Sequence, residues 1–115
     1  MIKVLTIVGT RPEIIRLSRV ISKLETSTNH ILVNTNQNYD YNLNKVFFAD
    51  LSISQPNYNF QIKSGSAIEV ISQIISQTEH ILNKENPDAV LILGDTNSCL
   101  SSYVAKRMKI PIFHM

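Results

Sequence analysis

Two short polar segments follow apolar runs and hold the residues of this chain that are best suited to chemistry. The first reads Gly-Thr-Arg-Pro-Glu over residues 9–13, and the second reads Gly-Asp-Thr over residues 94–96. A glycine lets a ligand approach the backbone closely, and the guanidinium of Arg11 offers a fork of donors that suits phosphate. The helix expected after each segment adds free N–H groups at its positive end. Together these features predict a phosphate site that contains Arg11 and Asp95.

The same two residues also allow plainer interpretations, which stay open at this point. Arg11 and Asp95 could form a structural ion pair, or Asp95 could serve only as the cap of the helix that follows it. The chain has neither a G-x-G-x-x-G fingerprint nor a Walker lysine motif. Nicotinamide cofactors and ATP hydrolysis are therefore disfavoured.

Other polar side chains give weaker signals. Gln37 lies in the polar stretch 34–38, where solvated turn residues are the default interpretation. His30 and His80 have no partner at metal-ligand spacing, so no metal site is expected. His114 follows an apolar run and is by default a packed histidine.

Apolar periodicity predicts the strands and helices that must position these segments. Short apolar runs predict strands at residues 3–8, 30–33, 58–60, 89–93 and 110–113. Apolar residues spaced by three or four predict helices over residues 10–24, 40–51, 66–86 and 97–109. Strands that alternate with helices indicate right-handed βαβ units. The expected fold class is therefore α/β, a Rossmann-like parallel sheet flanked by helices.

Two helix starts carry clear capping signals. Thr10 can cap the first helix with Glu13 in its first turn, and Ser66 forms a capping box with Glu69. In the usual doubly wound order the first and fourth strands are neighbours, and their carboxyl ends meet at one edge of the sheet. The two polar segments that follow these strands should therefore face one crevice.

Length and composition bound the class of protein. The chain has 115 residues, of which 43% are hydrophobic and 17% are charged, which excludes a disordered polymer. With 11 Lys and Arg against 9 Asp and Glu, the net charge of +2 is too small to indicate a nucleic-acid or membrane partner. The single Cys99 excludes an internal disulfide and is typical of a reducing compartment, and no apolar run is long enough to span a membrane. We expect a soluble cytoplasmic protein.

The last apolar run predicts that part of the domain is missing. Parallel strands are normally covered by helices on both faces, and the sequence offers nothing after Ile110–Phe113 that could cover this run. We therefore expect residues 1–115 to form an incomplete domain, with apolar surface exposed around Ile110 and Ile112.

Four motifs occur in the order and at the positions found in a known family. GTRPE after the first strand, T-x-Q at residues 35–37, GDT after the fourth strand and IPIFHM at residues 110–115 resemble the non-hydrolysing UDP-N-acetylglucosamine 2-epimerases. The resemblance covers the whole chain, and GTRPE together with GDT is its most specific part. A narrower resemblance is to the branch that converts UDP-2-acetamido-2,6-dideoxy-L-talose to UDP-N-acetyl-L-fucosamine for capsule or O-antigen. It rests on residues 14–19, 38–41, 46–48 and 94–99.

The resemblance implies the N-terminal domain of a GT-B-like two-domain protein, a homodimer when complete, that holds a UDP-2-acetamido sugar between its domains. It implies inversion at C2 without a metal or another cofactor. UDP leaves as the C2 proton is removed, and it adds back as a proton returns to the opposite face. The implied catalytic residues are Asp95 and Arg11. The implied substrate-binding residues are Gly9, Thr10, Arg11, Glu13, Gln37, Gly94, Thr96 and His114.

Two departures from the family pattern matter. Many members have histidine after the T-x-Q glutamine, whereas this chain has Asn38, which is no proton shuttle and favours the fucosamine branch. Members continue with Glu-Ala-Gly after the residues that resemble His114 and Met115, and with a second domain that supplies most uridine and sugar contacts. Two other functions stay open: a non-catalytic module that binds a nucleotide sugar or phosphate, and half of a GT-B glycosyltransferase related by fold alone.

Overall fold

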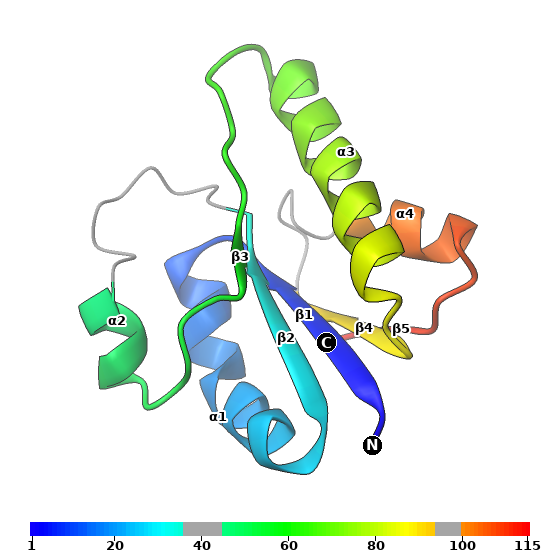
Figure 1. Ribbon diagram of the computed structural model, residues 1–115. Helices are drawn as coiled ribbons and strands as arrows, with labels where there is room; N and C mark the ends of the chain where they lie inside the picture. Colours follow the sequence, from blue (N-terminus) through cyan, green and yellow to red (C-terminus); the bar gives the residue numbers. More distant parts are fainter. Residues whose placement is uncertain (36–44, 94–99) are drawn as a thin grey trace.

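The computed structural model of the protein describes residues 1–35, 45–93 and 100–115, which form one parallel sheet with helices on both faces (Figure 1). The strands are β1 Lys3–Val8, β2 Asn29–Asn34, β3 Tyr58–Asn59, β4 Ala89–Ile92 and β5 Ile112–His114. The helices are α1 Arg11–Ser27, α2 Lys45–Asp50, α3 Ala67–Glu85 and α4 Ser101–Arg107. The strand order is β3-β2-β1-β4-β5, and every neighbouring pair is parallel. The expected α/β fold class is confirmed.

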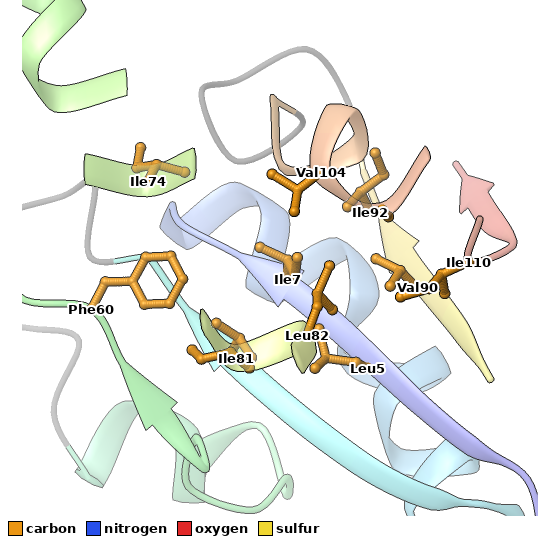
Figure 2. Packing of buried hydrophobic residues seen from close by; sticks show 12 residues of the cluster. Leu5, Ile7, Phe60, Ile74, Ile81, Leu82, Val90, Ile92, Val104 and Ile110 are labelled. Atoms are coloured by element: carbon orange, nitrogen blue, oxygen red, sulfur yellow. The ribbon is translucent and has the colours of Figure 1, made fainter. Parts of the chain in front are cut away.

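Alternation along the strands divides the core between the two faces of the sheet. Ile7 of β1 packs in a cluster with α3 and α4, whereas the next residue, Val8, packs with α1 and α2. Val33 and Leu32 of β2 divide in the same way, because successive side chains of a strand point to opposite faces. Figure 2 shows the first cluster, in which Leu82 of α3 lies beside Leu5 and Ile7 of β1. Val104 of α4 lies beside Ile92 of β4 in the same cluster. Burial on both faces explains why the central strands read as nearly continuous apolar runs.

Both expected capping signals are confirmed. The Thr10 hydroxyl accepts a hydrogen bond from the Glu13 backbone N–H at the start of α1. Ser66 and Glu69 make both hydrogen bonds of the capping box at the start of α3. No helix among the described residues is both long enough and apolar enough to cross a membrane.

Two glutamine side chains of α3 hold the extended segment that follows β3. The Gln77 amide accepts from the Gln61 N–H at 3.3 Å and donates to the Gln61 carbonyl at 3.1 Å. One turn earlier, the Gln73 amide accepts from the Lys63 N–H at 2.6 Å and donates to the Lys63 carbonyl at 2.9 Å. The segment therefore runs along α3 beyond the short strand β3, as the ribbon in Figure 1 shows.

The structure differs from the expected boundaries near the end of the chain. Helix α4 ends at Arg107 rather than at Lys109, and β5 begins at Ile112 rather than at Ile110. Lys109 has a left-handed φ of 61°, and the Ile110 N–H then donates to the Ala105 carbonyl. This turn folds Ile110 under α4.

Burial at the end of the chain also differs from the expectation. The prediction of exposed apolar surface at Ile110 is wrong, because this side chain is 9% exposed and belongs to the core cluster. Ile112 is half-buried against the same cluster. The exposed apolar side chain of β5 is Phe113, at 61%.

The remaining predicted elements agree with the structure apart from their ends. Strand β2 includes Asn34, which the sequence assigned to a polar loop. Helix α2 starts at Lys45, and the expected cap Asp40 lies outside the described residues. The first three residues expected in the last helix, 97–99, also lie outside them.

Candidate active site

Strands β1 and β4 end at the same edge of the sheet. They pair in parallel, with Leu5 opposite Val90, so their carboxyl ends point the same way. The first and fourth strands are therefore neighbours, as the sequence predicts. The segment 9–13 begins where β1 ends. In the sequence, Gly-Asp-Thr follows the last residue of β4 after Leu93, and its residues 94–96 lie outside the described part of the chain. An open parallel sheet binds its ligands at such an edge, where the strand order reverses.

The first turn of α1 is held by a reciprocal contact between two predicted site residues. The Thr10 hydroxyl donates to Glu13 Oε1 at 3.0 Å while it accepts from the Glu13 N–H at 3.4 Å. The Glu13 side chain is 4% exposed, so its carboxylate is buried against this turn. Arg11 lies between these two residues in the sequence. The contact therefore fixes the backbone from which the arginine projects.

The Arg11 guanidinium lies against an aromatic ring of α2. Its central carbon is 5.2 Å from the centroid of the Phe47 ring, which is within the range of a cation–π contact. Phe47 in turn packs edge-on against Phe48 at 5.7 Å, and Phe48 is fully buried. The sequence interpretation missed this role of Phe47. The sequence did offer one sign of this role. Two consecutive phenylalanines on a short amphipathic helix cannot both face the core, so one of them can contact another group.

His114 lies at the same edge of the sheet as segment 9–13. It pairs with Ile92 in the register of β5 and β4, and the backbone N–H of Met115 donates to the Ile92 carbonyl. Its side chain is exposed rather than packed. The described site residues Gly9, Thr10, Arg11, Glu13 and His114 are therefore brought to one edge, from strands on either side of β4. Gln37, Gly94, Asp95 and Thr96 lie outside the described residues.

Three polar residues at the ends of β2 and β3 extend this edge. From the sequence, Asn34 and Asn59 had no assigned role, and Thr35 was named only as the first residue of the T-x-Q motif. Asn34 is fully buried, and its amide donates to Asn59 Oδ1 at 3.2 Å. Thr35 is also fully buried, directly after β2. Only the unusual run of polar residues after an apolar strand could have indicated them.

The described part of the chain offers no cluster of side chains suited to a metal ion, because it contains no group of three or more His, Cys, Asp or Glu side chains that could hold one. His30 lies at the opposite, amino end of β2, where its Nε2 is 2.7 Å from the Thr6 hydroxyl. Burial lowers the pKa of His30.

These features define a class of protein. A parallel sheet whose central strands end in a glycine-containing turn, an arginine and a helix N-terminus is a Rossmann-like domain of the nucleotide-binding type. Comparison with known proteins gives the family. Residues 22–115 match the family described as UDP-N-acetylglucosamine 2-epimerase, and the chain belongs to that family.

Two curated relatives illustrate the range of substrates within this similarity. The chain is 42% identical over 115 residues to the UDP-N-acetylglucosamine 2-epimerase of Methanocaldococcus jannaschii, covering 98% of this chain and 31% of that protein. It is 38% identical over 117 residues to the UDP-2,3-diacetamido-2,3-dideoxy-D-glucuronate 2-epimerase of Pseudomonas aeruginosa, covering 98% of this chain and 33% of that protein.

Solved structures agree with this assignment. The M. jannaschii epimerase in complex with UDP-GlcNAc and UDP superposes with a TM-score of 0.90 at 40% identity, over 98% of this chain and 32% of that one. The Rickettsia bellii UDP-N-acetylglucosamine 2-epimerase superposes with a TM-score of 0.88 at 55% identity, over 100% of this chain and 31% of that one. The chain thus spans about a third of the length of these relatives, and the expected resemblance to the family is confirmed.

Proposed function

We propose that the complete protein inverts C2 of a UDP-2-acetamido sugar. The observation that carries the proposal is the turn at residues 9–13. It places Arg11 and the N-terminus of a 17-residue helix at the carboxyl edge of the sheet, in a chain of the epimerase family. Residues 1–115 form the first, incomplete domain of this protein in our proposal, and a second domain closes the site.

The proposed reaction proceeds by elimination and re-addition. A base removes the C2 proton, the electrons of that bond form a C1–C2 double bond, and the bond from C1 to the UDP oxygen breaks. UDP then adds back to C1 while a proton returns to the opposite face of C2. The leaving diphosphate carries developing negative charge, which Arg11 and the free N–H groups of α1 stabilise.

The remaining site residues have supporting roles in this proposal. Asp95 serves the proton transfers, directly or by positioning another group, because the C2 proton is only weakly acidic. Gly9 and Gly94 let the substrate approach the backbone. Thr10 and Glu13 hold the turn that carries Arg11. Gln37, Thr96 and His114 line the cleft.

The proposal also specifies which sugar the UDP-sugar substrate carries. We propose UDP-2-acetamido-2,6-dideoxy-L-talose as the substrate and UDP-N-acetyl-L-fucosamine as the product, for the synthesis of a bacterial surface polysaccharide in the cytoplasm. Asn38 after Gln37 supports this branch. The complete protein acts as a homodimer in this proposal and needs no metal or nicotinamide.

An isotope experiment tests the reaction. The complete protein is incubated in deuterated water with UDP-N-acetylglucosamine, with the L-talose sugar nucleotide, or with the diacetamidoglucuronate nucleotide. Deuterium at C2 of the product is expected, with the highest kcat/KM for the L-talose compound. Product without deuterium would exclude proton removal at C2. A higher kcat/KM for another sugar would overturn the branch and leave the reaction intact.

A further inference from the structure

Thr35 holds a buried hydroxyl without a hydrogen-bond partner. Its side chain is fully buried, and its Oγ1 is the one buried side-chain oxygen or nitrogen of the described residues that lacks a partner. An unpaired polar group in a protein interior destabilises the fold, because it loses its hydrogen bonds to water and gains none in return. Native structures rarely keep such a group without a reason.

The other buried polar side chains of the described residues are paired. Thr6 contacts His30, Glu13 contacts Thr10, Asn34 contacts Asn59, Ser18 donates to the Ile15 carbonyl, and Thr78 contacts Ser101. Valine has nearly the same shape as threonine and would fill the position without this penalty. The hydroxyl of Thr35 is therefore not explained by packing.

The position of Thr35 places it beside the proposed active site. Its backbone N–H donates to the Val8 carbonyl at 2.8 Å, so Thr35 continues the pairing of β2 with β1 just where segment 9–13 begins. Ile31 and Val33 pack against the cluster of α3 and α4, and alternation puts Thr35 on that same face. A threonine hydroxyl can move between staggered positions about the Cα–Cβ bond without any movement of the backbone.

We infer that Thr35 is a further substrate-binding residue, whose hydroxyl hydrogen-bonds an oxygen of the bound UDP-sugar. The inference rests on the proposed function of the same site. The unpaired state belongs to the ligand-free protein, and binding supplies the missing partner. The Thr35 hydroxyl therefore forms a hydrogen bond with the ligand without first breaking a hydrogen bond within the protein.

Two substitutions in the complete protein separate the hydroxyl from the methyl group. Thr35→Val keeps the shape and removes the hydroxyl, and Thr35→Ser keeps the hydroxyl and removes the methyl. We expect Thr35→Val to raise the Tm of the ligand-free protein by about 1–3 °C, because an unpaired group is lost. We expect the same variant to raise the Kd for UDP-N-acetylglucosamine about tenfold, because one hydrogen bond is lost.

Thr35→Ser should behave in the opposite way, with a lower Tm and a Kd within about twofold of the wild-type value. A structural role for Thr35 cannot produce these opposite signs. Titration with UDP alone locates the contact. If Thr35→Val raises the Kd for both ligands, the hydroxyl contacts the nucleotide. If it raises the Kd for the sugar nucleotide alone, the hydroxyl contacts the sugar.

Three results would overturn the inference about Thr35, and only one of them would also overturn the proposed function. Wild-type Kd values for Thr35→Val, in a protein that epimerises, would remove Thr35 from the site and leave the proposed function intact. A lower Tm for Thr35→Val would mean that the hydroxyl is paired in the free protein. A complete wild-type protein that binds neither UDP nor UDP-N-acetylglucosamine would overturn the proposed function together with this inference.

Discussion

The hydroxyl groups of Thr78 and Ser101 lie 2.9 Å apart between α3 and α4, and both side chains are fully buried. The Thr78 hydroxyl also lies 2.7 Å from the Ile74 carbonyl, to which it donates its only proton. Ser101 must therefore donate to Thr78. The start of α4 has no side-chain cap, so this contact between helices is a specific polar anchor for its first residue.

Thr78→Val should destabilise the protein by about 1–3 kcal/mol, because it leaves the buried Ser101 hydroxyl without an acceptor. Urea denaturation would measure the change. The double variant Thr78→Val with Ser101→Ala should regain most of the lost stability, since neither hydroxyl then remains buried. Equal destabilisation by the single and double variants would show that packing, not the hydrogen bond, matters at this contact.

Arg11→Ala in the complete protein should lower kcat/KM by about 100-fold or more, because the departing diphosphate loses its donor. The melting curve should change little, since Arg11 is only half-buried. Arg16→Ala provides the matched control: it removes the same charge from an exposed position of α1 and should leave kcat/KM unchanged. Near-normal turnover of Arg11→Ala would reduce Arg11 to a structural residue that packs on Phe47.

His30 should make stability depend on pH below its ordinary pKa of 6.5. Burial lowers the pKa of His30 in the folded protein, and the nearby Glu25 only partly opposes this shift. Between the lowered value and 6.5 the unfolded chain binds more protons, so stability falls as the pH is lowered through this window.

Urea titrations between pH 7.5 and about pH 5 would measure this effect of His30. His30→Gln should lose stability less steeply with falling pH than the wild type. His80→Gln, on the exposed side of α3, serves as the control and should keep the wild-type slope. Parallel curves for the wild type and His30→Gln would contradict the prediction.

Lys109→Gly should stabilise the protein by about 0.5–1 kcal/mol, because Lys109 has a left-handed φ of 61° that glycine adopts without strain. The backbone hydrogen bonds that end α4 there do not involve the lysine side chain. Lys106→Gly, inside α4, should destabilise by a similar amount. A fall in Tm for Lys109→Gly would mean that the lysine side chain contributes more than its backbone strain.

The 115-residue chain alone should bind UDP weakly and show no turnover, because in our proposal it supplies only one wall of the cleft. Association of this chain is expected through the exposed Phe113 of β5. Sedimentation should therefore show fewer dimers or aggregates for Phe113→Ser than for the wild type. Turnover by a monomer of this chain would contradict the proposal that a second domain completes the site.

The fold was predictable where the sequence shows a continuous apolar run, a helical apolar stripe or a capping motif. The runs at 3–8 and 89–93 are buried on both faces, and Ser66 with Glu69 marks the start of α3 without ambiguity. The end of α4 was not predictable, because Lys109 continues the basic pattern of a helix end while its backbone is already left-handed. Tertiary contacts under α4, rather than local preference, then decide the burial of Ile110.

The candidate site was predictable only in part. The βαβ alternation predicts a parallel sheet, and the usual doubly wound order makes the first and fourth strands neighbours. The observed order agrees and brings Arg11 and His114 to one edge. The contact of Arg11 with Phe47 depends on how α2 returns to the sheet, which no local pattern encodes. The T-x-Q motif marks Thr35 in the sequence, but its unpaired hydroxyl is a property of its surroundings and only the structure reveals it.

The pairing of Gln73 and Gln77 with the segment after β3 has a consequence for encounters between chains. A free sheet edge recruits other chains because its backbone groups can template a new strand. At Gln61 and Lys63 those groups are already occupied by side-chain amides, in the manner of an adjoining strand. Intermolecular strand addition is thereby disfavoured along this margin, and two half-buried glutamines do the work of a covering strand without any additional backbone.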